Sequence, residues 1–302
     1  MKKKNAILLA LAAIIWGFAF SAQKVGNVMG PLAFNGIRCI VGGIVLLPAI
    51  PLLKRYEGGK TGTVRELFRA GILCGICLCV GADLQQIGLQ YTSAGKAGFI
   101  TAMYIVLVPI AGLAFRKKCS RNAWIGVGLA VAGLFCLCIL TDAETGSNEM
   151  LGNCIILVCA VAFTAHILVV DHYASRVNGV ALSCIQFFTA GIITLVLMFI
   201  FEEPSLKAIL SEPGAILYAG VMSCGIAYTF QILGQDGVNP TLASLILCFE
   251  SVFSVVGGIL FLGDSMSGVE WLGCALMFLG IVISQLPTAQ ERQANQKERE
   301  AA

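Results

Sequence analysis

Ten apolar windows fill most of the chain, and each is long enough to cross a lipid bilayer. Each window has roughly 18 to 23 residues, which is the length an α-helix needs to span a hydrocarbon core. The windows lie at about residues 5–24, 32–53, 69–90, 95–115, 122–140, 151–171, 179–201, 213–233, 240–262 and 269–286. The 302-residue chain is 58% hydrophobic and only 12% charged, which excludes an ordinary soluble domain. The sequence therefore predicts an all-α membrane protein with ten transmembrane helices joined by short connections.

The basic residues predict the orientation of these helices, because Lys and Arg near the ends of spans tend to stay in the cytoplasm. With the N-terminus inside, 16 of the 20 Lys and Arg fall on the cytoplasmic side, and only Lys24, Lys96 and Lys207 fall outside. We therefore expect both termini in the cytoplasm, with residues 287–302 as a charged cytoplasmic tail. This topology accounts for the net charge of +3 without a nucleic-acid partner.

The chain contains an internal duplication. When the sequence is slid along itself, residues 1–140 align with residues 150–286, so that Trp124 matches Trp271. Each unit holds five predicted spans, and because five is odd, the second copy enters the membrane from the opposite side. The sequence thus predicts two inverted five-helix repeats, one in residues 1–140 and the other in residues 150–286.

Two polar seams recur at the same 4, 3, 4 spacing, 145 residues apart. They consist of Cys79, Asp83, Gln86 and Gln90, and of Cys224, Tyr228, Gln231 and Gln235. Residues at this spacing share one face of a helix. Matching polar seams in so apolar a chain predict an interior cavity lined by both halves.

Polar side chains at membrane depth are costly, at about 2.5 to 3.5 kcal/mol for each charged group near the bilayer centre. We therefore expect those in the spans to face inward and to line a path for a solute, together with aromatic side chains. The candidate solute-binding residues are Trp16, Arg38, Gln86, Tyr104, His166, Gln186, Tyr228 and Gln231.

Asp83 and Glu250 are the candidates for proton coupling, because a carboxylate in a low-dielectric interior can exchange protons near neutral pH. The alternative is a structural ion pair, for instance with Arg38. Arg38 could instead extend its long side chain to the outer surface, and His166 could serve only as a hydrogen-bond donor to a neighbouring helix. The sequence leaves these alternatives open.

The motifs of several other function classes are missing from the sequence. It contains no HExxH, no GxSxG and no GxxxxGK[ST], so it offers no basis for metalloprotease or serine-hydrolase chemistry or for direct use of ATP. Cys74 and Cys77 have CxxC spacing, yet no second pair or His is spaced to complete a metal site. We expect no cofactor, no metal and no enzymatic activity.

Several of these features resemble those of a known protein family. The chain's ten short spans and inverted units, together with Trp16-Gly17, Arg38, the stretch from Glu250 to Asp264 and the following Trp271-Leu-Gly273, are similar to the drug/metabolite transporter superfamily, and within it to the EamA-type permeases. The resemblance covers nearly the whole chain. It implies export, or occasionally uptake, of amino acids, related metabolites or amphiphilic compounds across a bacterial inner membrane.

The chain departs from the family pattern at three places. Ser251 stands where family members often have Pro, Arg116 replaces the acid common at the end of the fourth span, and Asp264 stands for the usual Glu at the end of the ninth. These departures put helix kinking at those places in question.

Taken together, the sequence predicts a secondary transporter that works by alternating access in the bacterial inner membrane. We expect export of a small amphiphilic metabolite, such as an amino acid or a related compound. The rival functions are a channel-like facilitator and an intramembrane enzyme. The expected partners are the solute and the lipid bilayer. The sequence leaves open whether protons are the coupling ions and whether the chain forms a homodimer.

Overall fold

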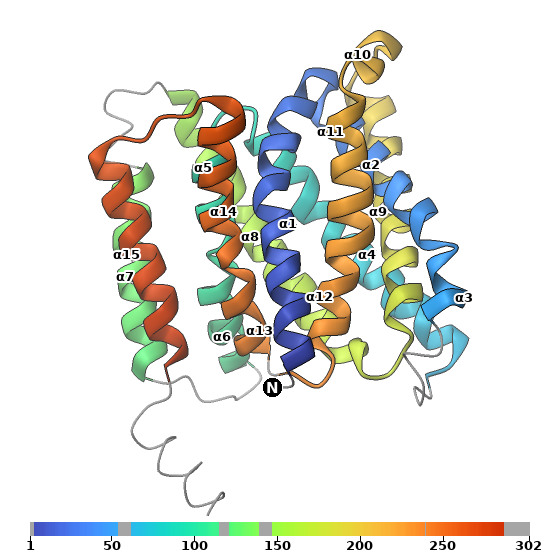
Figure 1. Cartoon of the computed structure of the whole chain (residues 1–302), viewed down its shortest axis with the longest axis horizontal. Coiled ribbons are helices and arrows are strands. Elements are labelled where there is room, and N and C mark those ends of the chain that lie inside the picture. Colours follow the sequence, from blue (N-terminus) through green and yellow to red (C-terminus); the bar gives the residue numbers. More distant parts are fainter. Residues whose placement is uncertain (1–2, 54–61, 115–120, 139–146, 239, 287–302) are drawn as a thin grey trace, which may run out of the picture.

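The computed structural model describes residues 3–53, 62–114, 121–138, 147–238 and 240–286, and every regular element among them is a helix (Figure 1). The expected all-α class is therefore confirmed. The predicted tail, residues 287–302, and Arg116 at the end of the fourth window lie outside the described residues.

The first half of the chain forms seven α-helices and one short 3-10 helix. They are α1 (Lys3–Gly26), the 3-10 turn Asn27–Met29, α2 (Pro31–Leu46), α3 (Ala49–Leu53), α4 (Val64–Gly88), α5 (Ala94–Thr101), α6 (Tyr104–Ala114) and α7 (Arg121–Cys138). Thr63 caps α4 by accepting the Glu66 amide at 3.2 Å, and Ser93 caps α5 in the same way. Such caps satisfy backbone N–H groups that the first helical turn leaves unpaired.

The second half contains α-helices and two π-helical stretches. They are α8 (Ser147–Ala174), α9 (Gly179–Phe201), α10 (Leu206–Ser211), α11 (Pro213–Leu217), the π-helix Tyr218–Ala227, α12 (Tyr228–Gln235), α13 (Pro240–Leu247), α14 (Phe249–Gly257), the π-helix Gly258–Leu262 and α15 (Gly268–Gln285). A capping box between Ser267 and Glu270 fixes the start of α15.

Six helical segments among the described residues are long and apolar enough to cross a membrane. They are Lys3–Met29, Val64–Gly88, Ala94–Gly112, Asn148–Ala174, Gly179–Phe201 and Pro213–Gln235. Four shorter apolar helices, Pro31–Leu46, Trp124–Gly133, Phe249–Leu262 and Gly268–Gly280, coincide with the other four predicted windows. The total of ten spans thus stays a prediction.

Two of the predicted spans are broken near their middle. The window at 95–115 divides into α5 and α6, and the window at 240–262 divides into α13 and α14. At the second break the Ser251 hydroxyl donates to the Cys248 carbonyl at 2.8 Å, which satisfies a backbone group near the interruption. These interruptions form without a proline at the break. Ile105 follows Tyr104, the first residue of α6, and Ser251 follows Glu250, near the start of α14.

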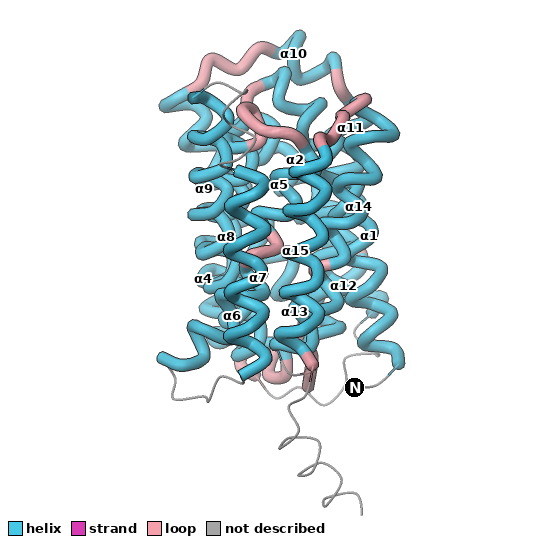
Figure 2. Tube along the Cα trace, turned by 90° about the vertical axis from the view of Figure 1, so that its left-hand side faces the viewer, coloured by secondary structure: helices cyan, strands magenta, loops and turns pink. Residues whose placement is uncertain are grey.

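The long helices run roughly side by side and form one bundle (Figures 1 and 2). Helix α2 packs on α9, α4 lies against both α8 and α9, and α1 packs on α14 and α12. Helices α7 and α15 pair at one edge of the bundle (Figure 1). A Cβ atom on Gly133 or Gly280 would lie 2.6 Å from a backbone carbonyl of the partner helix, so both glycines allow this pair to approach closely.

The outer surface of the bundle is rich in large apolar side chains, while its interior holds polar side chains beside an apolar core. Large apolar residues point outward, with Phe199 and Phe201 both 73% exposed. Polar residues are buried, including Arg38, Gln86 and Glu250 at 4% exposure or less. This arrangement suits a hydrocarbon surround, in which an outward apolar surface carries no penalty.

A buried lysine joins three helices at the end of the bundle where α5 begins. The Lys96 ammonium lies 2.5 Å from Glu149 Oε1 and 2.8 Å from Glu270 Oε1, and its side chain is only 4% exposed. These ion pairs link α5 to the first turns of α8 and α15.

Replacing Lys96 with Met should destabilise the protein, because Glu149 and Glu270 would then face each other without their shared cation. We expect a loss of about 2 kcal/mol, less than for a fully buried pair because both carboxylates keep some access to solvent. Thermal unfolding of purified protein measures this. Adding Glu149→Gln and Glu270→Gln should restore most of the loss, whereas an unchanged melting temperature in Lys96→Met would contradict the structural role.

Candidate functional site

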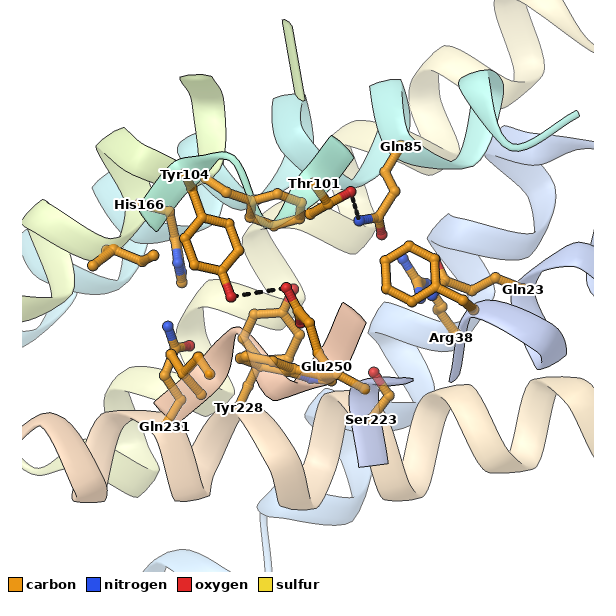
Figure 3. Close-up of a pocket in the computed structure, with 15 residues that line it drawn as sticks. Gln23, Arg38, Gln85, Thr101, Tyr104, His166, Ser223, Tyr228, Gln231 and Glu250 are labelled. Carbon is orange, nitrogen blue, oxygen red and sulfur yellow. Dashed lines mark hydrogen bonds between the residues drawn. The ribbon is translucent and has the colours of Figure 1, made fainter. Parts of the chain in front are cut away.

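A polar cavity lies inside the helix bundle (Figure 3). The space open to water-sized molecules is about 40 Å³, enough for a few waters. Its lining mixes charged, amide, hydroxyl and aromatic side chains from both halves of the chain. The lining residues are Trp16, Phe20, Gln23, Arg38, Gln85, Thr101, Tyr104, Phe163, His166, Ile167, Ser223, Tyr228, Gln231, Leu247 and Glu250.

The structure brings most of the candidates from the sequence to this one cavity. Those that line it are Trp16, Arg38, Tyr104, His166, Tyr228, Gln231 and Glu250. Asp83, Gln86 and Gln186 do not line it. Sequence reasoning did not single out Gln23, Gln85, Thr101 or Ser223, which do.

Glu250 and Tyr104 meet across the cavity. The Tyr104 hydroxyl donates a hydrogen bond to Glu250 Oε1 at 2.8 Å (Figure 3). Both residues stand at the breaks described above, with Tyr104 as the first residue of α6 and Glu250 in the first turn of α14. A carboxylate in the first turn also benefits from the positive end of the helix dipole. The helix breaks therefore place a carboxylate and a phenol at the cavity wall.

Tyr228 is the centre of an aromatic wall. Its ring centroid lies 4.6 Å from that of Trp16, 5.2 Å from that of Phe187 and 5.9 Å from that of His166. All three ring pairs have edge-to-face geometry, which aromatic rings favour. Tyr228 is the first residue after the π-helix, so this irregular stretch sets its position on the wall. Phe163 lines the cavity as well.

Arg38 points into the cavity and is held at one nitrogen only. Its Nε donates to Asn35 Oδ1 at 2.8 Å, and its guanidinium carbon lies 5.6 Å from the Phe34 ring centroid. The two terminal nitrogens have no hydrogen-bond or ion-pair partner among the described residues. Arg38 is 4% exposed, so it does not extend to the surface, and it forms no direct ion pair with Asp83 or Glu250.

Asp83 lies beside the cavity, in a separate polar cluster between α2, α4 and α9. Its carboxylate accepts hydrogen bonds from Asn35 Nδ2 at 2.5 Å and from Thr194 Oγ1 at 2.9 and 3.0 Å. The Cys79 thiol also approaches it at 3.3 Å. Since Asn35 contacts both Asp83 and Arg38, it connects the carboxylate to the cavity.

His166 and Gln186 form a pair between α8 and α9. His166 Nε2 lies 3.0 Å from Gln186 Oε1, and both side chains are almost fully buried. His166 thus both lines the cavity and makes the interhelical hydrogen bond that the sequence left as its alternative role. Gln186 does not line the cavity but contacts His166, which does.

Gln86 and its neighbour Gln85 point in different directions. Gln86 Nε2 donates to Gln23 O and to Asn27 Oδ1, each at 2.8 Å, and so joins α4 to the end of α1. Gln85 lines the cavity and donates to the Thr101 hydroxyl at 3.1 Å (Figure 3).

Several buried polar atoms of lining residues have no hydrogen-bond partner within the described part of the chain. They are Trp16 Nε1, Gln23 Oε1 and Gln231 Oε1. A buried unpaired polar atom costs about 1 to 3 kcal/mol. These atoms therefore favour a cavity occupant that offers both donors and acceptors. Among the described residues, no group of three His, Cys, Asp or Glu side chains is arranged to hold a metal ion.

Replacing Gln86, whose amide nitrogen donates two hydrogen bonds, should cost more stability than replacing Gln231, whose Oε1 has no partner among the described residues. Gln86→Leu would leave Gln23 O and Asn27 Oδ1 without their donor, and we expect a loss of about 1 to 3 kcal/mol. Gln231→Leu removes an Oε1 atom that has no partner and should cost less. Chemical or thermal unfolding of the two variants tests this difference, and an equal loss would contradict the assignment.

Comparisons with known proteins identify a family and several similar transporters. The sequence model of the EamA-like transporter family matches the chain twice, at residues 3–139 and 150–286. An uncharacterized transporter of Archaeoglobus fulgidus is 29% identical over 280 residues, covering 92% of this chain and 84% of that protein.

Two bacterial proteins show similar likeness. The uncharacterized inner membrane transporter YedA of Escherichia coli K12 is 25% identical over 287 residues, covering 90% of this chain and 88% of its own. The uncharacterized transporter YwfM of Bacillus subtilis 168 is 27% identical over 291 residues, covering 94% and 95%. A solved protein structure with 16% identity matches the fold with a TM-score of 0.70, covering 94% of this chain and 98% of the other.

Proposed function

Because the chain belongs to the EamA-like transporter family, we propose that it is a secondary carrier that exports a small amphiphilic metabolite by alternating access. The solute class that fits its cavity best is an amino acid or a related compound. The membrane is the bacterial inner membrane, with both termini in the cytoplasm, as the basic residues predict.

The observation that carries this proposal is the presence of opposite charges and aromatic rings in one cavity. Arg38 has two unoccupied terminal nitrogens, and a planar guanidinium binds a carboxylate well. Glu250, held by Tyr104, offers a negative group that suits an ammonium. Figure 3 shows Glu250 between Tyr104 and Arg38. A zwitterion fits this polarity.

The aromatic wall suits the apolar part of such a solute. Trp16, Phe163 and Tyr228 line the cavity beside the charged groups. Rings of this kind bury apolar groups and bind cations on their faces. Unpaired Trp16 Nε1 and Gln231 Oε1 add a donor and an acceptor. The combination supports an amphiphilic solute over a purely apolar one.

Several pairings of helices support the inverted-repeat architecture that alternating access uses. Helix α2 packs on α9 and α7 on α15, and the duplication matches the members of each pair. The matched spans α5–α6 and α13–α14 are both broken, and their breaks meet through Tyr104 and Glu250. In Figure 1, α1 begins and α15 ends at the same end of the bundle.

Entry of the solute requires the bundle to open, because the cavity of about 40 Å³ admits only a few waters. Contacts between the predicted halves must then break at one end. The ion pairs of Lys96 with Glu149 and Glu270 join the first half to the second, and polar contacts of this kind can separate into water. We propose that they hold the outer end closed in this conformation.

Proton coupling, if it operates, belongs to Glu250. Its carboxylate faces the cavity, where it can meet both solute and water, whereas Asp83 is enclosed by Asn35, Thr194 and Cys79. Transport driven by the solute gradient alone is the other mode of coupling, and the pH dependence of flux separates the two.

Binding should depend on Arg38 and Gln231 and much less on Gln86. A thermal-shift screen of purified protein against amino acids, nucleosides and vitamins first identifies the solute, since a ligand that prefers the folded state raises the melting temperature. Arg38→Gln should then weaken binding at least tenfold because the carboxylate loses its charge partner. Gln231→Leu should weaken it several-fold, whereas Gln86→Leu should leave affinity nearly unchanged. Equal affinity in wild type and Arg38→Gln would remove the proposed carboxylate site.

Glu250→Gln should separate coupling from exchange. In proteoliposomes we expect this variant to lose flux driven by a pH gradient, because the amide cannot release a proton, while keeping solute counterflow. A wild-type response to pH in Glu250→Gln would exclude Glu250 from coupling. Saturation and counterflow in the wild type are expected of a carrier, and flux that rises linearly without counterflow would indicate a channel-like facilitator.

A further inference from the structure

A second site is present at the end of the bundle where α4 begins and α8 ends. A groove of about 920 Å³ lies there and shares no lining residue with the central cavity. Its lining residues are Thr63, Arg65, Glu66, Arg69, Ile72, Leu73, His172, Tyr173 and Arg176. We call it the basic groove.

The basic groove carries an excess of positive charge. Arg65, Arg69 and Arg176 line it together with one carboxylate, that of Glu66. Glu66 Oε1 lies 3.7 Å from Arg176 Nη1, and both side chains of this ion pair are partly exposed. Arg65 and Arg69 have no ion-pair partner in the described part of the chain. At least two guanidinium groups are thus available to an anion, and guanidinium forms bidentate hydrogen bonds with phosphate.

The same face of α4 changes from cationic to apolar along its axis. Arg65, Arg69 and Leu73 are four residues apart, so they stack on one face at about one helical turn, or 5.4 Å, each. The side chains of Ile72 and Leu73 are 44% and 39% exposed, as suits a segment apolar enough to span a membrane. The cations stand at the mouth of the span and the apolar side chains one turn deeper.

This order matches the build of a phospholipid. A bilayer places its charged headgroups in a layer several ångströms thick outside the hydrocarbon core, and basic pockets between helix ends bind anionic headgroups. A free phosphate or a soluble anion would use the arginines but gain nothing from the apolar floor. We infer that the basic groove binds an anionic phospholipid, with its phosphate between Arg65, Arg69 and Arg176 and an acyl chain along Ile72 and Leu73.

A bound lipid would also tie together two helices from different halves of the chain. Helix α4 belongs to the first predicted repeat and α8 to the second, and Glu66 and Arg176 already connect them at this end. A phosphate shared by Arg69 and Arg176 strengthens the same junction. This inference requires only that the bundle spans a membrane, so it stands or falls independently of the solute proposed above.

The test measures lipid binding to the delipidated full-length protein. We expect phosphatidylglycerol to raise the melting temperature more than phosphatidylcholine with the same acyl chains. The double variant Arg65→Gln/Arg69→Gln should bind phosphatidylglycerol roughly 30-fold more weakly, since each cation near an anionic lipid contributes to affinity. Arg121→Gln is the matched control, because Arg121 is exposed and begins α7 at the same end of the bundle (Figure 1), and it should bind as the wild type does.

Three outcomes of these binding measurements overturn the inference. They are equal stabilisation by both lipids, an equal loss of affinity in Arg121→Gln, and stabilisation by glycerol 1-phosphate alone to the extent seen with the lipid, which would indicate a site for soluble phosphate. If a variant does not fold, crosslinking the wild-type protein with photoreactive phosphatidylglycerol tests the same groove. Adducts within residues 65–73 and 172–176 support the groove, and adducts confined to other segments overturn it.

Discussion

The structure depends on one constraint: hydrocarbon offers no hydrogen bonds, so every polar group within the spans must pair inside the bundle or face an enclosed polar space. The protein uses both solutions. The Asp83 carboxylate accepts hydrogen bonds from Asn35, Thr194 and Cys79. These bonds link three helices. Arg38 lines the cavity, and its terminal nitrogens have no partner in the described part of the chain. The same physical cost thus gives fixed contacts between helices where partners are present and a polar cavity where they are not.

The interrupted helices explain how a polar cavity forms within the bundle. An unbroken helix would satisfy its own backbone and present only side chains, whereas the breaks before Tyr104 and Glu250 turn two helix starts toward each other. The π-helix ending at Ala227 has a related effect, because it shifts the register of the following turn and places Tyr228 on the cavity wall. Irregular helical geometry at this depth is tolerated because it faces protein and the cavity rather than lipid.

The all-helical class and 7 of the 15 residues that line the cavity could be predicted from the sequence, because apolar windows and buried polar residues have few solutions in a bilayer. The rotation of each helix could not. Spacing places Asp83 and Gln86 on one face of α4, but only the packing of α4 against α8 and α9 determines that Gln85 is the one that reaches the cavity. Small side chains such as Ser223 carry no sequence signal at all. The interruptions near Tyr104 and Glu250 were also hidden, since neither is marked by a proline at the break.

The polar cavity within the apolar bundle should be reached from water. Cysteine labelling in membranes tests it most directly, after replacement of the 13 native cysteines. Ser223→Cys places a thiol of similar size on the cavity lining, and Ile192→Cys places one on the outward surface, where Ile192 is 57% exposed. We expect a small charged thiol reagent to modify the cysteine at 223, more slowly when solute is bound, and to leave the one at 192 unmodified. Reaction at 192 with none at 223 would contradict this expectation.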